Sequence, residues 1–296
     1  MTGLPDGVER DAPIARLTTL GTGGPARFLA RPSTEAGLQN VLDWIGAEQL
    51  DMAVVGLGSN LLAADAGFDG VVVKLVGELA AVHRDGDLLR CGGGASLAVI
   101  VRRSTDWGLA GIEFGCAIPG TVGGAVRMNA GAHGGEMRDV LVEATVARPG
   151  SSRHADVGGL DLSYRHSNVA ADEVVAAAQL RLRPDDSEAV RARVAAMQAQ
   201  RKATQPAKVR TFGSVWKNPS PELSAGRLLE ESGLKGYAIG GARISPVHAN
   251  FIENTGGATS ADVIALMTEA RRRASERGVE LQHEVQMVGP IALPDQ

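Results

Sequence analysis

Residues 119–134, PGTVGGAVRMNAGAHG, decide how this chain is interpreted, because they contain little that could fill a protein core. Pro119 and Gly120 predict a rigid corner, Thr121 offers a hydroxyl, and Asn129 offers an amide. A segment so poor in bulky side chains packs badly unless another molecule occupies the space. A large flat ligand with a diphosphate would supply both the packing and an anion for the backbone amides. The alternative is a Gly-rich loop used for tight packing between domains.

A second glycine stretch, VVGLGSNLL, occupies residues 54–62. Gly56 and Gly58 begin the dinucleotide fingerprint G-x-G-x-x-G, but position 61 is Leu and no long helix follows. The fingerprint needs a helix N-terminus facing the pyrophosphate, so a Rossmann site is disfavoured. Consecutive amides of a glycine turn can bind an anion without a helix, with Ser59 and Asn60 as additional donors. An ordinary turn is the other interpretation, and the residues alone leave both open.

The composition is that of a globular chain able to bury large cores. Of its 296 residues 44% are hydrophobic and 22% are charged, with a net charge of −4. This balance gives no electrostatic reason to expect nucleic-acid binding, and no stretch approaches the ~20 apolar residues that cross a bilayer. Two cysteines make neither a disulfide framework nor a zinc site, HEVQM lacks the second His of H-E-x-x-H, and no signal peptide is evident. We expect a cytoplasmic monomer without metal, membrane or nucleic-acid partners.

Helical and strand periodicities alternate along the chain and predict an α+β protein. Amphipathic helices are expected at 34–49, from Ser96 onward, along a polar connector after Pro184, and after a cap at Ser260. A buried strand is expected at 52–62, and further strands near 70–76, 140–147, 174–183, 248–254 and 279–289. We predict a flexible N-terminus at 1–14, followed by domains at 15–76, 77–204 (ending in the connector helix) and 205–296.

Seven motifs occur in the order of one known family, from about residue 15 to 290: LTTLGTGGPA, VVGLGSNLL, IPGTVGGAVRMNAGAHG, SYRHS, GSVWKNP, AGRLLEESGLKGYAIGGARISPVHANFIEN and HEVQMVG. In these motifs the chain resembles the UDP-N-acetylenolpyruvoylglucosamine reductases, flavoenzymes of bacterial peptidoglycan biosynthesis, in their shorter, type II form. The resemblance implies two α+β subdomains, at 15–76 and 77–204, that hold FAD in the fold of vanillyl-alcohol-oxidase-type (PCMH) flavoproteins. It also implies a C-terminal substrate-binding domain at 205–296.

The chemistry that the resemblance implies uses FAD held without a covalent bond and NADPH as electron donor. The substrate would be UDP-N-acetylglucosamine enolpyruvate, and the product UDP-N-acetylmuramate. By the family pattern Ser214 protonates the substrate carbon, Arg165 stabilises the enolate that forms beside the carboxylate, and Glu284 is the third catalytic residue. Tyr164, Lys217 and Asn218 would bind the substrate.

The same resemblance implies cofactor contacts from both glycine stretches. The residues carried over are Gly56, Gly58, Ser59, Asn60, Leu61, Pro119, Gly120, Thr121, Gly123, Gly124, Asn129, Gly131 and Ala132. Two positions depart from the pattern: Trp216 stands where the family usually has Phe, and His133 where an aromatic such as Tyr is common. The first departure affects the shape of the substrate pocket. Flavins of this fold are sometimes attached through His, but the reductases of this family hold FAD without a bond, and we expect the same here despite His133.

Two other functions fit part of the pattern. Another FAD-dependent oxidoreductase, such as an oxidase of sugars or alcohols, would share the glycine stretches but gives no reason for GSVWKNP or the terminal glutamate. A non-enzymatic flavin- or nucleotide-binding protein would tolerate the loss of Ser214, Arg165 and Glu284, all of which are present.

Overall fold

The computed structural model describes residues 3–294, and contacts between them divide the chain into two compact units. The first unit contains the residues up to Arg10 together with Phe28–Gly56 and Gly70–Arg201. The second contains Asp11–Arg27, Leu57–Asp69 and the chain from Lys202 onward. Two segments of the N-terminal half, Asp11–Arg27 and Leu57–Asp69, therefore fold with the C-terminal part. The continuous domains expected from the sequence do not include this arrangement. No helix within residues 3–294 has the length and apolarity to cross a bilayer.

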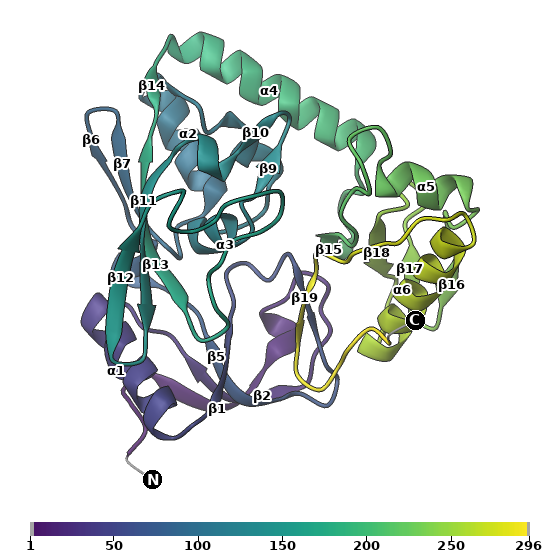
Figure 1. The fold of residues 1–296 in the computed structure, drawn as a ribbon, viewed down its shortest axis with the longest axis horizontal. Coiled ribbons are helices and arrows are strands. Elements are labelled where there is room, and N and C mark those ends of the chain that lie inside the picture. Colours follow the sequence, from purple (N-terminus) through teal and green to yellow (C-terminus); the bar gives the residue numbers. More distant parts are fainter. Residues whose placement is uncertain (1–2, 295–296) are drawn as a thin grey trace. The chain divides into compact units, whose positions relative to one another are not determined.

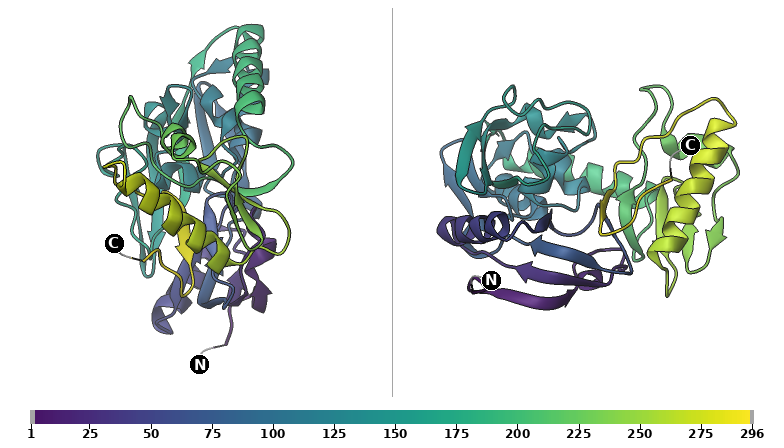
Figure 2. Two further views of the ribbon diagram at one scale, coloured as in Figure 1. Left: turned by 90° about the vertical axis from the view of Figure 1, so that its right-hand side faces the viewer. Right: turned by 60° about the horizontal axis from the view of Figure 1, so that its bottom comes forward.

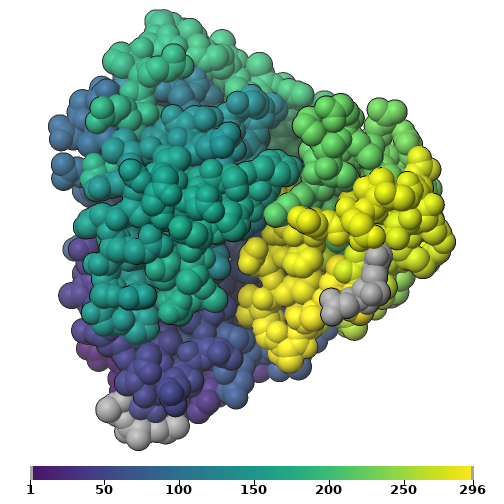
Figure 3. All heavy atoms as spheres, in the orientation of Figure 1, coloured from purple at the N-terminus to yellow at the C-terminus, as the bar shows by residue number. Residues whose placement is uncertain are grey.

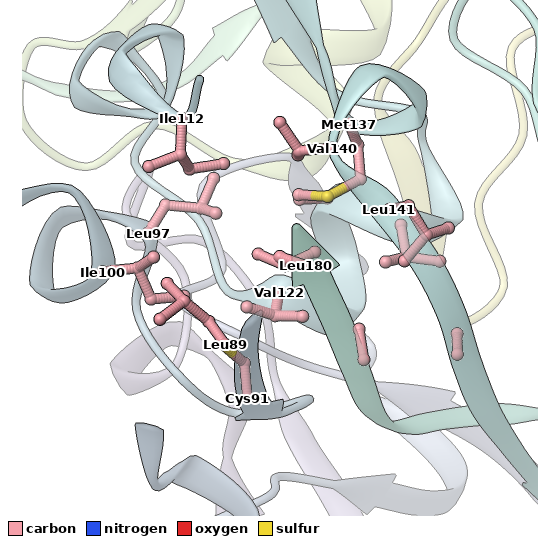
Figure 4. Packing of buried hydrophobic residues seen from close by; sticks show 14 of the residues in the cluster. Leu89, Cys91, Leu97, Ile100, Ile112, Val122, Met137, Val140, Leu141 and Leu180 are labelled. Atoms are coloured by element: carbon pink, nitrogen blue, oxygen red, sulfur yellow. The ribbon is translucent and has the colours of Figure 1, made fainter. Parts of the chain in front are cut away.

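The first unit is built on a five-stranded antiparallel sheet in the order β12-β11-β13-β7-β6 (Figure 1). Its strands are β6 (Val82–Asp85), β7 (Leu88–Gly92), β11 (Leu141–Arg148), β12 (Ser151–Ala155) and β13 (Val174–Arg181). Helices α2 (Leu97–Asp106) and α3 (Val122–Arg127) contribute Leu97, Ile100 and Val122 to the same buried cluster as Leu89 and Leu180 of the sheet (Figure 4). Cys91 lies in this cluster, and burial raises its pKa to about 12, as fits a structural thiol.

The alternation of side chains along β11 and β13 divides their buried residues between two cores. Val146 and Val175 belong to the core of α2 and α3, whereas Ala147 and Val174 belong to a core shared with α1. Helix α1 (Glu35–Ala47) starts at the Thr34 cap and buries the face expected from its periodicity. The same core contains residues of β2 (Pro25–Ala30) and β5 (Phe68–Val73).

Strands β2 and β5 belong to a four-stranded sheet in the order β1-β2-β5-β3. The strand β3 (Asp51–Val54) pairs in parallel with β5 but is not buried as expected, because it lies at the edge of this sheet and its residues are half-buried or exposed. The opposite edge strand, β1 (Val8–Pro13), lies within the N-terminal segment that we expected to be flexible. Pairing with β2 orders this part of the segment.

The second unit is built on an antiparallel sheet in the order β15-β18-β17-β16. Its strands are β15 (Arg210–Ser214), β16 (Ala238–Ile239), β17 (Ala242–Ile244) and β18 (Phe251–Asn254). Helix α6 (Ser260–Ser275) packs on β16 and β17, as Figure 2 shows, and α5 (Ala225–Glu231) packs on α6. The cap of α6 is Thr259 and not Ser260 as predicted, because the Thr259 hydroxyl accepts the Asp262 amide in a capping box.

A short parallel pair completes the second unit. Strand β4 (Leu61–Ala63) pairs with β19 (Gln286–Val288), so the expected terminal strand is regular over only three residues. Residues from Lys202 onward, green to yellow in Figure 3, form a continuous part of the molecular surface.

The remaining elements are short, apart from the connector helix α4 (Ser187–Thr204), which buries only Val190. The short strands are β8 (Leu109–Ala110), β9 (Gly131–Ala132), β10 (Gly135–Glu136) and β14 (Arg183–Pro184). Single turns of 3₁₀-helix occur at Ile14–Arg16, Gly77–Ala80, Glu113–Ala117 and Met137–Asp139.

Candidate active site

The motif GSVWKNP leaves β15 through a backbone irregularity. The register between β15 and β18 shifts between Thr211 and Ser214, and Gly213 has φ 83°, a left-handed conformation that favours glycine. A bulge of this kind re-aims the following side chain, and bulges are frequent beside active sites. The sequence thus places the hydroxyl of Ser214, which is half-buried, just after a backbone kink.

Asn250 holds the motif from the other side. Its Oδ1 accepts the Trp216 amide and its Nδ2 donates to the Trp216 carbonyl, both at 2.9 Å, while its own carbonyl accepts the Val215 amide at 2.9 Å. Asn250 is 4% exposed and Trp216 is 2% exposed. The side chain of Asn250 therefore replaces a strand partner, and the amide and carbonyl of Trp216 are both satisfied inside the protein.

Glu284 lies beside this motif. The Glu284 amide donates to the Val215 carbonyl at 2.9 Å, and the Lys217 amide donates to the Gln282 carbonyl at 2.9 Å, in an antiparallel arrangement. This pairing brings Glu284 next to the residue that follows Ser214, although the two residues are far apart in the chain. The side chains of Glu284 and Ser214 are both half-buried.

The first glycine stretch, residues 54–62, also contacts the segment that contains Glu284. The Asn60 side chain donates to the Glu284 carbonyl at 2.9 Å, and the Gln286 amide donates to the Asn60 carbonyl at 3.0 Å. A Cβ on Gly213 would lie 3.3 Å from the Ser59 carbonyl oxygen. Parts of three motifs that are widely separated in sequence therefore meet within the second unit.

Arg165 belongs to the first unit and stands on a tight hairpin. Ser163 and His166 exchange backbone hydrogen bonds, which leaves Tyr164 and Arg165 as the two turn residues. Arg165 has φ 54°, and its Nη2 donates to the Gly131 carbonyl at 2.8 Å. Its guanidinium lies 5.1 Å from the ring centre of Tyr164, which is 49% exposed. The hairpin thus presents a cation and an aromatic ring next to the second glycine stretch.

Two glycines of the first unit are required by close packing within the protein, whereas a third lies at an exposed position of α3. A Cβ on Gly56 would lie 2.5 Å from the Thr121 Oγ1. A Cβ on Gly123 would lie 3.0 Å from the Gly93 carbonyl oxygen, because α3 packs directly on the backbone of the sheet. In contrast, the nearest atom to a Cβ on Gly124 would be the Thr121 Oγ1 at 3.8 Å, an ordinary contact distance, and Gly124 is exposed, so a cofactor such as FAD could approach α3 at this glycine.

Lys74 is a candidate cofactor residue that the sequence analysis did not identify. Its ammonium donates to the Gly56 carbonyl, and no carboxylate among the described residues forms an ion pair with it. Burial, followed by the positive charge of Arg31, lowers the pKa of Lys74. A half-buried ammonium beside Gly56 can stabilise an anion bound at that glycine turn. The signal in the sequence was a lysine within the otherwise apolar run VVVKLV.

Three of the residues singled out by resemblance have structural surroundings of their own. Trp216 packs into the core of the second unit with Phe212 and Leu228, so its replacement of Phe is a matter of core packing. His133 forms, with Gly134, the two-residue turn between β9 and β10, and its φ of 52° suits that turn. Asn129 is fully buried, with its side-chain amide bonded to protein groups.

Comparison with known proteins decides the family. Residues 205–288 match the model described as UDP-N-acetylenolpyruvoylglucosamine reductase, C-terminal domain, and residues 26–154 match an FAD binding domain. The reductase of Sphingopyxis alaskensis is 44% identical over 285 residues, which are 94% of this chain and 93% of the relative. The chain belongs to the UDP-N-acetylenolpyruvoylglucosamine reductase family.

Two further reductases are similar over nearly their whole length. Reductase 2 of Symbiobacterium thermophilum is 41% identical, with 96% of this chain and 93% of the relative covered. The crystal structure of the reductase from Thermus caldophilus superposes with a TM-score of 0.83 at 37% identity, covering 95% of this chain and 98% of that one. These similarities confirm the family, the α+β fold and the FAD cofactor that the sequence predicted.

The individual site residues remain predictions. Within the second unit the structure brings Ser214, Glu284 and Asn60 together, and within the first unit it brings Arg165 to Gly131. Ser214 and Arg165 belong to different units, so their convergence on one substrate is part of the proposal that follows.

Proposed function

We propose that this chain reduces the enolpyruvyl group of UDP-N-acetylglucosamine enolpyruvate with NADPH, giving UDP-N-acetylmuramate for peptidoglycan. Family membership supports the overall reaction. The assignment of residues is supported by the backbone bond between Glu284 and Val215, which follows Ser214, and by the bond from the Asn60 side chain to the Glu284 carbonyl. An oxidase on the same fold would have no use for this pairing.

When bound, FAD would supply the hydride chemistry that links NADPH to the substrate double bond. The two glycine stretches would hold it, with Lys74 beside Gly56 as a counter-charge for the diphosphate. Of the residues carried over by resemblance, Gly124 is exposed on α3, whereas Gly56 and Thr121 pack closely against each other. Asn60 and Asn129 use their side-chain amides to fix the backbone, each within its own unit.

Ser214 holds the proton that the substrate carbon receives. Hydride addition at the methylene carbon leaves negative charge on the neighbouring carbon and its carboxylate, and this strongly basic centre must be protonated. A serine hydroxyl is a poor acid in water and can act only when it is fixed within hydrogen-bond reach of that carbon. The bulge at Gly213 and the two hydrogen bonds from the Asn250 side chain to the backbone of Trp216 provide this fixation.

Arg165 binds the substrate carboxylate and stabilises its additional charge as the enolate forms. A guanidinium presents a planar set of donors that matches a carboxylate, and its charge is permanent. Its Nη2 already donates to the Gly131 carbonyl, which limits the directions that the remaining donors can take. Preorganised donors of this kind stabilise the developing charge without reorganisation during the reaction.

The other proposed roles concern binding and orientation. Glu284 is the third catalytic group, and its backbone pairing with Val215 and Asn60 keeps it beside Ser214. Lys217 contributes a cation and Tyr164 an exposed aromatic face to the sugar nucleotide. Asn218 accepts the Ala225 amide at 3.1 Å, which orients its carboxamide for the substrate. We further propose that the enzyme works in the cytoplasm as a monomer.

One assay separates the reductase from the alternatives: NADPH oxidation by the purified protein, with and without UDP-N-acetylglucosamine enolpyruvate. We expect substrate-dependent oxidation with one product formed per NADPH consumed. Oxygen consumption without this substrate would identify an oxidase, and the absence of any turnover would identify a binding protein.

The role of Ser214 is tested by measuring the two half-reactions separately. In Ser214→Ala we expect normal bleaching of the flavin by NADPH and a recovery by substrate that is slower by about 10²–10⁴-fold, the usual contribution of general acid catalysis. Ser220→Ala is the matched control, since this nearby hydroxyl only accepts the Leu223 amide. Normal recovery in Ser214→Ala would show that another group delivers the proton.

A further inference from the structure

A closed ring of hydrogen bonds connects the second glycine stretch to the hairpin of Arg165. The Asn129 side chain donates to the Ser163 carbonyl at 3.0 Å, and Ser163 forms the base of the hairpin. At the tip, the Arg165 Nη2 donates to the Gly131 carbonyl at 2.8 Å. Gly131 follows Asn129 by two residues, so both bonds end on the same short segment.

Asn129 is itself fixed by the residues that follow it. Its second amide hydrogen donates to the Glu136 Oε2 at 2.8 Å, and its Oδ1 accepts the Arg138 amide at 3.0 Å. A carboxamide has two N–H donors, and here both are used inside the protein. Asn129 has no exposed surface. Its side chain is therefore not placed to donate to a bound cofactor, which is the role that the family resemblance suggested.

The ring joins two residues in unfavourable backbone conformations. Asn129 has φ 37° and Arg165 has φ 54°, both in the left-handed region. Non-glycine residues in this conformation are strained and persist where the surroundings fix them, often at functional sites. A two-residue turn with arginine in this conformation would relax readily if its base lost the bond from Asn129.

We propose that Asn129 is a positioning residue: it sets the direction of the Arg165 guanidinium through the Ser163 carbonyl, with Glu136 holding its amide in place. This inference rests on the proposed function, in which Arg165 binds the substrate carboxylate. Asn129 touches no reacting group and acts only through the hairpin. Removal of its carboxamide leaves Arg165 charged but less well directed.

The test uses the holoenzyme of Asn129→Ala beside a matched control, Asn168→Ala. Asn168 follows the Arg165 hairpin in sequence and also donates its amide to a backbone carbonyl, that of Gly159 at 3.0 Å, but it is exposed and this bond ends outside the hairpin. In Asn129→Ala we expect a 10–100-fold slower substrate half-reaction, since small misplacements of a binding group cost about this much. The affinity for UDP-N-acetylmuramate, measured by calorimetry, should fall about 10-fold.

Flavin content and the rate of flavin bleaching by NADPH should stay within about twofold of wild type in Asn129→Ala, and Asn168→Ala should be unchanged throughout. Loss of flavin in Asn129→Ala with an intact substrate half-reaction would overturn the inference and identify Asn129 as a cofactor residue. Should Asn129→Ala fail to fold, Glu136→Gln, which keeps the shape but not the charge of the acceptor, should show a smaller defect in the same half-reaction. A Glu136→Gln variant with wild-type kinetics would equally contradict the inference.

A double-mutant cycle with Arg165→Lys completes the test. If Asn129 acts through Arg165, then adding Asn129→Ala to Arg165→Lys should slow the substrate half-reaction less than threefold further. Independent, multiplying defects would refute the positioning role while leaving Arg165 in the site. A wild-type rate in Arg165→Lys alone would instead refute the proposed role of Arg165, so the two failures are distinguishable.

Discussion

Removing the Asn250 side chain should destabilise the protein more than any exposed asparagine could. Asn250→Ala takes away the acceptor of the Trp216 amide and the donor to the Trp216 carbonyl, both at 2.9 Å in a site where Asn250 is 4% exposed. Each buried backbone group left without a partner costs about 1–3 kcal/mol. The two together give roughly 2–6 kcal/mol, and we expect about 3 kcal/mol because a water molecule can enter part of the vacated space.

Urea denaturation of the flavin-free protein, followed by circular dichroism and tryptophan fluorescence, measures this loss. For a unit of this size, a loss of about 3 kcal/mol in the free energy of unfolding would also lower Tm by roughly 10 °C in a thermal scan. Asn168→Ala is the matched control, because its single bond to the Gly159 carbonyl is exposed and should contribute less than about 0.5 kcal/mol. Equal stability of the two variants would refute the argument that Asn250 substitutes for a strand partner of the catalytic motif.

Three other substitutions test separate contacts. Lys74→Met should weaken FAD binding about 10–100-fold by equilibrium dialysis, as expected for the loss of one charged contact, and unchanged affinity would remove Lys74 from the site. Glu173→Gln should lower the free energy of unfolding by ~1 kcal/mol at pH 7. Hydrogen bonding to Arg153 lowers the pKa of Glu173 in the folded state, so this deficit should start to shrink as the pH falls below about 4.5 and vanish only below the lowered pKa. A deficit independent of pH would contradict this reasoning. Gly123→Ala should lower the free energy of unfolding by about 1–3 kcal/mol, measured by thermal unfolding, because its Cβ would press on the Gly93 carbonyl. Gly124→Ala should keep the stability of the wild type but bind FAD less tightly if this glycine faces the cofactor.

The elements with strong periodicity were predictable from sequence, and the edge and end effects were not. Helix α1 follows from its apolar spacing and the Thr34 cap. In contrast, β3 has the composition of a buried strand but lies at a sheet edge, and strand order is not encoded in local pattern. Likewise, Thr259 rather than Ser260 caps α6. The capping box needs the cap residue three positions before Asp262, and Thr259 has this spacing whereas Ser260 is one position too late.

For the site, resemblance identified the residue types but not what each side chain contacts. Asn129 stands in a glycine-rich motif that suggests a ligand, and only the structure shows its amide bonded to Glu136 and Ser163. Trp216 stands in a motif that suggests a pocket, yet it packs in a core. Conversely, Lys74 stands in no motif, and its proximity to Gly56 comes from the pairing of β3 with β5. The partner of each side chain depends on contacts between segments far apart in the chain, and a local sequence pattern does not predict such contacts.

The pairing of β4 with β19 has a consequence for how the polypeptide matures on the ribosome. Asn60 and Glu284, which meet beside these strands, are separated by 224 positions, so the partner of β4 is synthesised long after β4 itself. Chains with such distant pairings fold late and expose unpaired strand until the partner arrives. A nascent chain interrupted before Glu284 would thus lack this residue and the strand β19 that pairs with β4, and such unfinished products would be inactive and open to proteolysis.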